Sequence, residues 1–131
     1  EIEKAFKALA EMEDVGLGGT DQHAYSTLID ACGRLGQIDR ACEVAGLVKK
    51  RFGGDLSLET TNALLYALGM AGQVEEAFSL YNGLKKRSLT PSTITLSAIT
   101  SMCLKHRVLD RRVEEVCCSI PSYWFRTHRR L

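Results

Sequence analysis

The sequence predicts an all-α fold in which antiparallel helix hairpins stack side by side into a short solenoid. The first observation is an internal repeat: the stretch 25–51 returns 36 residues later, at 61–87, with its apolar, glycine and basic positions in register. A fixed period of roughly 20–50 residues is typical of stacked repeats, none of which buries its apolar face alone. The second observation is that apolar residues recur at helical spacing, while no stretch alternates strongly enough to predict a strand.

The two copies match at the positions that a helix hairpin needs. Glycine recurs where each hairpin must turn, and the small Ala41 and Ala77 would let paired helices approach closely. The matched pairs are Leu28 and Leu64, Ala31 and Ala67, Gly33 and Gly69, Gly36 and Gly72, Gln37 and Gln73, and Ala41 and Ala77.

The length, composition and net charge of the chain limit the classes of protein to which it can belong. The chain has 131 residues, 45% of them hydrophobic, which is enough for one compact or elongated domain. The formal net charge of +1 argues against a protein that holds nucleic acid by bulk charge alone. No apolar run approaches the ~20 residues that span a membrane. Because the chain opens within the pattern, without an initiator Met or a signal-like start, we expect a fragment or a processed product.

Residues 1–21 are expected to be the second helix of a truncated repeat. Apolar residues of 1–15 lie at helical spacing, and Ile2 and Ala5 stand 36 before Ile38 and Ala41. Glycines at 16, 18 and 19 would end this helix.

Two full repeats follow, at 22–57 and 58–92. In each, a first helix ends near a glycine, at Gly36 or Gly72, and a second helix follows it. Pro91 closes the second repeat, since proline cannot continue a helix. Asp21, Ser57 and Ser92 stand just before the three first helices and are expected as N-caps.

The unit at 93–120 is a degenerate terminal repeat. It begins at Thr93 and has a second helix running to about Ile120, but the glycine of the turn becomes Arg107 and the small alanine becomes Arg112. A more polar terminal repeat is expected where a stack ends. Pro121 then begins an aromatic and basic tail at 121–131.

At these residues the chain resembles the pentatricopeptide repeat (PPR) family. The family pattern has a first helix containing TYNTLI, a glycine turn, a second helix containing EAL, and a close with proline before Asp or Ser. The matching segments are Ala24–Ile29, Thr61–Leu65, Glu75–Phe78 and Thr90–Ser92. The resemblance covers about residues 22–117 and implies a right-handed solenoid. The tetratricopeptide pattern fits less well, because its Trp…Leu-Gly…Tyr signature is missing.

The resemblance implies sequence-selective binding of single-stranded RNA, one base per repeat, in a mitochondrion or plastid. In the family an uncharged polar residue of the first helix meets the base edge, assisted by the last residue of the repeat. Carried over, these are Ser26 with Ser57, Asn62 with Ser92, and Ser97 in the third unit. Asn and Ser side chains both suit a Watson–Crick edge. The same residues could equally be helix caps (Ser57, Ser92) and solvated polar residues (Ser26, Asn62).

Other family positions are filled differently here. A basic residue late in the first helix faces the RNA backbone in the family; Arg34 and Lys105 match it, whereas Met70 does not. Near the start of that helix the family usually has an aliphatic residue that sandwiches the base. The residues at those positions are His23, Glu59 and Ile94. Glu59 is a poor stacking surface and would repel phosphate.

Two basic groups have open interpretations. The Lys-Lys-Arg clusters at 49–51 and 85–87 could touch phosphates, but we favour a role as favourable charge at helix C-termini, away from the RNA groove. The tail residues Tyr123, Trp124, Phe125 and Arg126 could stack bases, dock a partner or cap the apolar end of the stack. We favour capping or docking.

Nothing in the sequence predicts a metal, a cofactor or catalysis. The five cysteines form no CxxC pair, and we expect reduced, intracellular thiols that serve as small core hydrophobes. The set Cys103, His106, Cys117, Cys118 and His128 lacks any usual zinc spacing. No phosphate-binding glycine loop, carboxylate pair or Ser/His/Asp set stands out. We therefore expect no enzyme and no small-molecule substrate.

Two functions from different classes remain. The first is an RNA-binding module in organellar transcript processing, stability or translation. The second is a non-catalytic scaffold that binds protein subunits of an organellar assembly, such as a ribosome or a membrane complex. Low net charge, Glu59 and Met70 favour the scaffold, whereas the polar and basic positions named above favour RNA. The resemblance places RNA slightly ahead.

Overall fold

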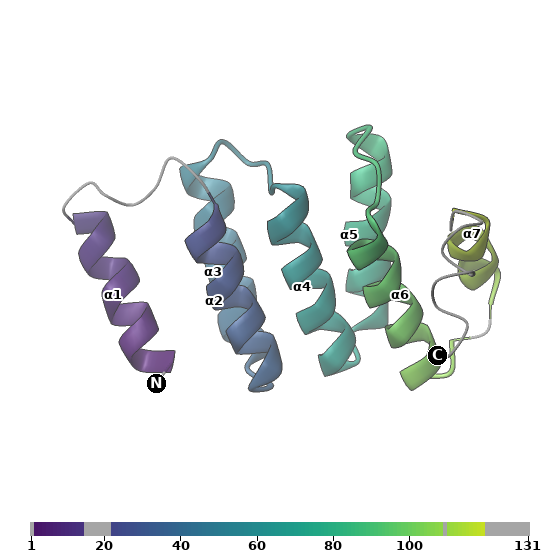
Figure 1. Cartoon of the computed structure of the whole chain (residues 1–131), viewed down its shortest axis with the longest axis horizontal. Coiled ribbons are helices and arrows are strands. Elements are labelled where there is room, and N and C mark those ends of the chain that lie inside the picture. The colour runs from purple at the N-terminus through teal and green to yellow at the C-terminus, as the bar shows by residue number, and fades with distance from the viewer. Residues whose placement is uncertain (1, 15–21, 109, 120–131) are drawn as a thin grey trace.

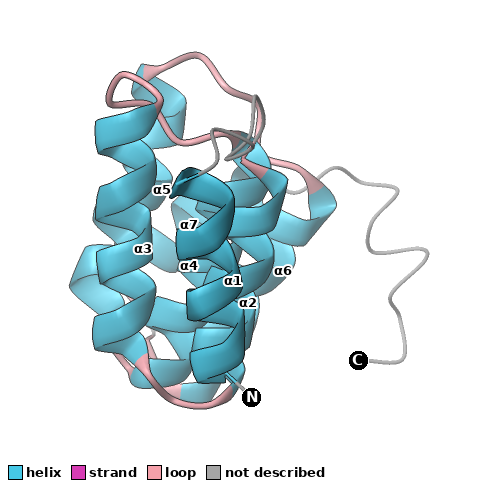
Figure 2. Ribbon diagram, turned by 90° about the vertical axis from the view of Figure 1, so that its left-hand side faces the viewer, coloured by secondary structure: helices cyan, strands magenta, loops and turns pink. Residues whose placement is uncertain are grey.

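The computed structural model describes residues 2–14, 22–108 and 110–119, which form seven helices and no strand (Figure 1). The helices are α1 (Ile2–Asp14), α2 (His23–Arg34), α3 (Ile38–Arg51), α4 (Leu58–Ala71), α5 (Val74–Lys86), α6 (Thr93–Lys105) and α7 (Arg111–Ser119). They follow one another in a row, and the view along that row shows α3 and α5 on the side away from α6 (Figure 2). The first helices α2, α4 and α6 pack on one another in sequence. The predicted all-α stack of helix hairpins is confirmed.

Each hairpin turns at a residue in the left-handed conformation. Gly36 has a φ of 71° and Gly72 a φ of 78°, which glycine adopts without a steric penalty. At the corresponding point of the third hairpin Arg107 has a φ of 52°. That conformation costs a residue with a Cβ roughly 1–2 kcal/mol. The sequence pattern is therefore lost at this point, but the geometry of the turn is kept.

Serine caps begin two of the first helices. Ser57 precedes α4, and its hydroxyl accepts from the backbone N–H three residues on, at 3.2 Å. Ser92 precedes α6 and forms a capping box with Thr95. Both caps were predicted. The residue before α2 is Gln22, whose side chain makes no capping bond, while Asp21 lies outside the described residues.

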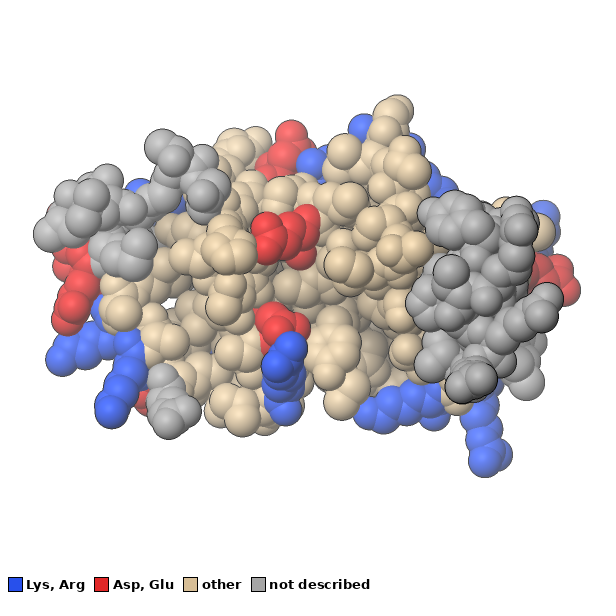
Figure 3. Space-filling view, in the orientation of Figure 1, with Lys and Arg blue, Asp and Glu red and all other residues tan. Residues whose placement is uncertain are grey.

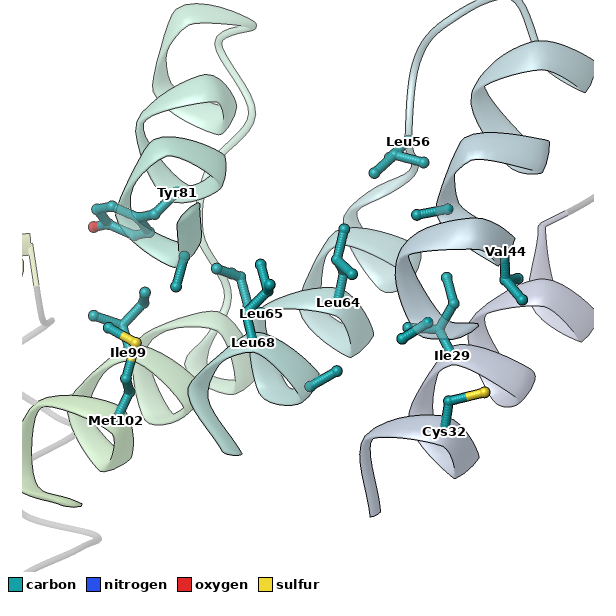
Figure 4. Packing of buried hydrophobic residues seen from close by; sticks show 14 of the residues in the cluster. Ile29, Cys32, Val44, Leu56, Leu64, Leu65, Leu68, Tyr81, Ile99 and Met102 are labelled. Carbon is teal, nitrogen blue, oxygen red and sulfur yellow. The ribbon is translucent and has the colours of Figure 1, made fainter. Parts of the chain in front are cut away.

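The hydrophobic core runs along the row of hairpins and has no single centre. Figure 4 shows Leu65 of α4 in the packing between Ile29 of α2 and Ile99 of α6, and all three are at most 1% exposed. Ala41 of α3 and Ala77 of α5 are fully buried. Each hairpin thus completes its core only against its neighbours, as a repeat protein requires.

Two arginines join the second helices of adjacent repeats in the same way. Arg40 of α3 lies 5.3 Å from the centre of the Phe6 ring in α1 and pairs with a glutamate one turn before that ring. Arg112 of α7 lies 4.5 Å from the Phe78 ring in α5 and 2.8 Å from a glutamate one turn before it. The two sets are related by a shift of two repeats. Arg112 therefore has a packing role where the sequence pattern indicated only decay.

The cysteines divide between core and surface, which corrects the expectation that most of them are core residues. Cys32 and Cys103 are buried, and burial raises the pKa of both thiols. Cys42, Cys117 and Cys118 are exposed. Helical spacing to apolar neighbours was too loose a criterion, because adjacent positions on a helix can lie just outside its buried stripe.

Candidate nucleic-acid interface

The first helices of the three hairpins form one shared groove. Each leaves room for the next at a glycine: a Cβ added to Gly33 would lie 2.9 Å from the Ala67 Cβ, and one added to Gly69 would lie 3.2 Å from the Met102 Cβ. The groove has a volume of about 680 Å³, and all of its lining residues belong to α2, α4 and α6. Equivalent residues at 35- or 36-residue intervals therefore form rows across it.

The predicted base-reading residues form one of these rows. Ser26, Asn62 and Ser97 all line the groove. They differ in exposure, because Ser26 is 3% and Asn62 9% exposed, while Ser97 is exposed. The Ser26 hydroxyl donates to the backbone carbonyl of His23, one turn earlier, at 2.8 Å. The structure thus brings the three together, with Ser97 the most accessible.

Asn62 joins α4 to α6 through its amide. Its Oδ1 accepts from the hydroxyl of Thr95 at 2.5 Å, and its Nδ2 donates to the Ser92 hydroxyl at 3.4 Å. Asn62 and Ser92, predicted as a pair, are therefore in contact, and Ser92 also caps α6. Oδ1 already accepts one hydrogen bond and Nδ2 donates one, so Asn62 can offer a ligand its second oxygen lone pair and its remaining amide N–H.

Ser57, predicted to read a base together with Ser26, is linked to Gln22. Its backbone N–H donates to the Gln22 side-chain oxygen at 2.8 Å, and the Thr60 hydroxyl donates to the same oxygen at 2.9 Å. Gln22 Nε2 also donates to the Asp55 carbonyl at 3.1 Å. Gln22 thus does for the first junction what Asn62 does for the second. The repeat pattern does not indicate this role for Gln22, since its equivalent in the next repeat is a leucine.

The row expected to sandwich bases contains a hydrogen-bonded pair. His23 Nδ1 lies 2.8 Å from Glu59 Oε1, which joins α2 and α4 across the mouth of the groove. The third member, Ile94, is 67% exposed. The departure from the family pattern therefore has a structural consequence: polar groups of adjacent repeats satisfy each other at the first junction, whereas an apolar surface faces solvent at the second.

The predicted backbone-contacting residues lie at the ends of the first helices. Arg34 is bonded to Asp30, one turn before it, at 3.1 Å. Lys105 Nζ lies 3.8 Å from the sulfur of Met70. In Figure 3 the visible face over α2, α4 and α6 is mostly uncharged, with Lys and Arg gathered along its lower edge, where these helices end. That edge is where a phosphate backbone would meet positive charge.

A further row was missed by the sequence analysis. Asp30, Tyr66 and Ser101 line the groove four residues after the base-reading row. Tyr66 is 38% exposed and is the one aromatic side chain among the described residues that line the groove. Its position could have been found from the sequence, because residues four apart share one helix face.

Outside the groove, the basic clusters end the second helices. Lys49, Lys50 and Arg51 form the last turn of α3, and the second cluster ends α5. Lys85 lies 5.0 Å from the centre of the Tyr81 ring. None of these residues lines the groove, which favours the interpretation of helix-end charge over phosphate contact.

The other described residues weighed in the sequence as possible metal ligands are not part of the groove lining. Among the described residues no three His, Cys, Asp or Glu side chains are grouped to hold a metal. His106 has its Nε2 at 2.8 Å from the Gly69 carbonyl oxygen and so joins the end of α6 to α4. Of the described helices, none combines the length and apolarity needed to span a bilayer. The tail residues Tyr123, Trp124, Phe125 and Arg126 lie outside the described residues.

Fold and groove together define a helical-repeat protein whose first helices share a groove. Sequence comparison finds repeats that begin close to the starts of α2 and α4. A PPR repeat profile matches residues 23–51, and a PPR repeat family profile matches residues 57–105. The chain belongs to the pentatricopeptide repeat family.

Several plant proteins are similar to this chain. A pentatricopeptide repeat-containing protein of Arabidopsis thaliana is 30% identical over 121 residues, which cover 91% of this chain and 16% of the relative. A second from the same plant is 37% identical over 78 residues, 60% of this chain and 12% of the relative. Pentatricopeptide repeat-containing protein 10 of Zea mays, named chloroplastic, is 28% identical over 82 residues, 63% of this chain and 10% of the relative. The chain thus spans less than a fifth of the length of these relatives.

Proposed function

We propose that this chain is part of an organellar protein that binds single-stranded RNA in the groove of α2, α4 and α6, in transcript processing, stability or translation. The observation that carries the proposal is the row Ser26, Asn62 and Ser97, which brings one polar side chain from each of three consecutive repeats to one groove. Amide and hydroxyl groups at a regular interval suit a series of unstacked base edges.

Charge and family membership support the same ligand. Arg34 and Lys105 stand at the ends of α2 and α6, where they can meet phosphates without covering the base-facing row. Proteins with these repeats are generally non-catalytic RNA-binding proteins, and relatives named chloroplastic support a plastid or mitochondrion. We infer that the chain contributes contacts to two or three bases and performs no catalysis.

RNA binding in the groove can be tested by charge reversal at matched sites. Fluorescence anisotropy would follow binding of labelled 12-nucleotide RNAs (U12, C12 and A12), and of an RNA duplex, over a salt series. The groove variant carries Arg34→Glu and Lys105→Glu, and the control carries Lys50→Glu and Lys86→Glu, with the same change in net charge. We expect the groove variant to lose at least about 10-fold in affinity and to show a shallower salt dependence, while the control binds like wild type.

The opposite result would redirect the proposal. Equal losses in both variants would mean that RNA is attracted by charge without using the groove. Tight binding to the duplex would contradict a single-strand site. If the wild-type protein binds none of these RNAs, the scaffold function is favoured.

The alternative function, a protein–protein scaffold of an organellar assembly, is favoured by one observation. Two carboxylates, Asp30 and Glu59, line the groove, and Tyr66 and Ile94 expose apolar surface within it. Such a mixture also suits a protein surface. Purification of the tagged full-length protein from organelles, with and without ribonuclease, distinguishes the two: co-purifying subunits that survive ribonuclease support the scaffold.

A further inference from the structure

The two halves of the groove are chemically unequal, and we propose that the half between α4 and α6 provides most of the base-dependent binding, with Tyr66 as the residue on which a nucleobase stacks. We call this half the α4–α6 site and define it by Asn62, Ala63, Tyr66, Ile94, Ser97 and Ala98, all of which line the groove. The inference rests on the proposed RNA function and adds to it a residue and a location.

The α4–α6 site combines an apolar surface with a polar edge. Tyr66 follows Asn62 by one helical turn, so both side chains leave α4 on the same side. The Tyr66 side chain remains 38% exposed, and across the groove Ile94 is 67% exposed. A planar ring with polar edges, such as a nucleobase, matches this composition, because its faces need apolar contact and its edges need donors and acceptors.

The corresponding half between α2 and α4 offers a base much less. His23 and Glu59 are hydrogen-bonded to each other at 2.8 Å, and a base placed there would have to separate them or lie against the Glu59 carboxylate. The Ser26 hydroxyl is already donated to its own helix, and Asp30 stands where α4 has Tyr66. Carboxylates also disfavour an approaching phosphate.

The residue of α6 that is equivalent to Tyr66 is not aromatic either. This counterpart is Ser101, so the row Asp30, Tyr66 and Ser101 contains one aromatic ring. Stacking is tolerant of base identity, because every base has a π-face. Tyr66 would therefore strengthen binding at one nucleotide, while Asn62 and Ser97 at its edge would distinguish among bases.

The test compares the ring, its hydroxyl and an exposed apolar residue elsewhere. Binding of labelled U12, C12 and A12 would be measured by anisotropy for the wild type, Tyr66→Ala, Tyr66→Phe and Leu47→Ala. Leu47 is 44% exposed on α3 and does not line the groove, so its variant controls for general loss of apolar surface. Circular dichroism of each variant checks that the helices remain.

A second arm places the contact on one base. In the tightest-binding 12-mer, single abasic substitutions would be moved along the strand. We expect Tyr66→Ala to weaken binding by about 10-fold or more, Tyr66→Phe and Leu47→Ala to change it less than about 2-fold, and the most sensitive abasic position to lose its effect in Tyr66→Ala.

The outcomes separate this inference from the function beneath it. If the wild type binds RNA and Tyr66→Ala binds equally tightly, the stacking role is overturned and RNA binding stands. If Tyr66→Phe loses as much as Tyr66→Ala, the hydroxyl is responsible and stacking is again overturned. If the wild type binds no RNA, the proposed function and this inference fall together.

Discussion

The junction between α2 and α4 and the junction between α4 and α6 are built on the same period with different side chains. At the first, Gly33 meets Ala67 so closely that an added Cβ would lie 2.9 Å from the Ala67 Cβ. At the second, Gly69 meets Met102, where the same distance is 3.2 Å. The repeat therefore sets the relative position of the helices, while the facing side chains decide how tightly they pack.

The polar contacts also differ between the two junctions. Gln22 crosses the first junction from before α2, outside the groove lining, whereas Asn62 crosses the second from within it. The His23–Glu59 pair then crosses the mouth of the first junction, and Ile94 leaves the second open and apolar. Two repeats that look alike in sequence thus present different surfaces to a ligand, and a comparison of equivalent positions can test each difference.

The largest effect is expected from filling the glycine positions. In Gly33→Ala the new methyl would meet both the Cβ and the backbone Cα of Ala67, at 2.9 and 3.0 Å, so the helices must separate. We expect the free energy of unfolding to fall by about 1–2 kcal/mol, after allowing for the better helix propensity of alanine. Gly69→Ala should cost less, because the nearest atom to the new methyl, the Met102 Cβ, lies further away, at 3.2 Å.

Urea unfolding followed by circular dichroism would measure this order. Gly46 in α3 is the matched control: nothing lies within 4 Å of its added Cβ, so Gly46→Ala should raise the free energy of unfolding by about 0.5–1 kcal/mol. Equal effects of the alanine substitutions at 33 and 69 would show that the two junctions are equally tight.

An intermediate effect is expected within the base-reading row. Asn62→Ala removes the bond to the hydroxyl of Thr95, a fully buried residue, and should lower the free energy of unfolding by about 1 kcal/mol. Ser26→Ala removes only a bond to its own helix, so we expect a loss below about 0.5 kcal/mol. The same urea titrations apply. A larger loss for Ser26→Ala would contradict the assignment of Asn62 as the link across the second junction.

The smallest effect on stability is expected from Asp110→Asn, just before the last described helix, α7. Hydrogen bonds from the Arg112 guanidinium are the main cause that lowers the pKa of the Asp110 carboxyl. Because the folded-state pKa is the lower one, the stabilisation is complete above the ordinary Asp value of about 3.9 and is lost as the pH falls through the folded-state pKa. Asp110→Asn should therefore lower the melting temperature slightly at pH 7 and leave it nearly unchanged near pH 2. A difference between wild type and variant that grows towards acid would reverse the assignment.

Much of the fold could be predicted from the sequence, because the period repeats the residues that shape a hairpin. Gly36 and Gly72 marked the turns, and Ser57 and Ser92 marked helix starts. Arg112 could not be interpreted from its own repeat, since its aromatic partner Phe78 belongs to the repeat before it. Sequence patterns show which residues recur, but they do not show contacts between side chains that differ from repeat to repeat.

The site was predicted in outline for the same reason. Ser26, Asn62 and Ser97 share a face because they share a helix position, and this follows from spacing alone. The partners of Asn62 and the pairing of His23 with Glu59 depend on how two helices lie relative to each other. Those relations require coordinates.

The most direct test of the account is to find where RNA lies on the protein. Single-stranded 12-mers carrying 4-thiouridine would be cross-linked to the wild-type chain by ultraviolet light, and the modified peptides identified by mass spectrometry. We predict cross-links in α2, α4 and α6, strongest in the peptide containing Tyr66. Cross-links confined to the basic ends of α3 and α5, at 49–51 and 85–87, would contradict the groove as the binding surface.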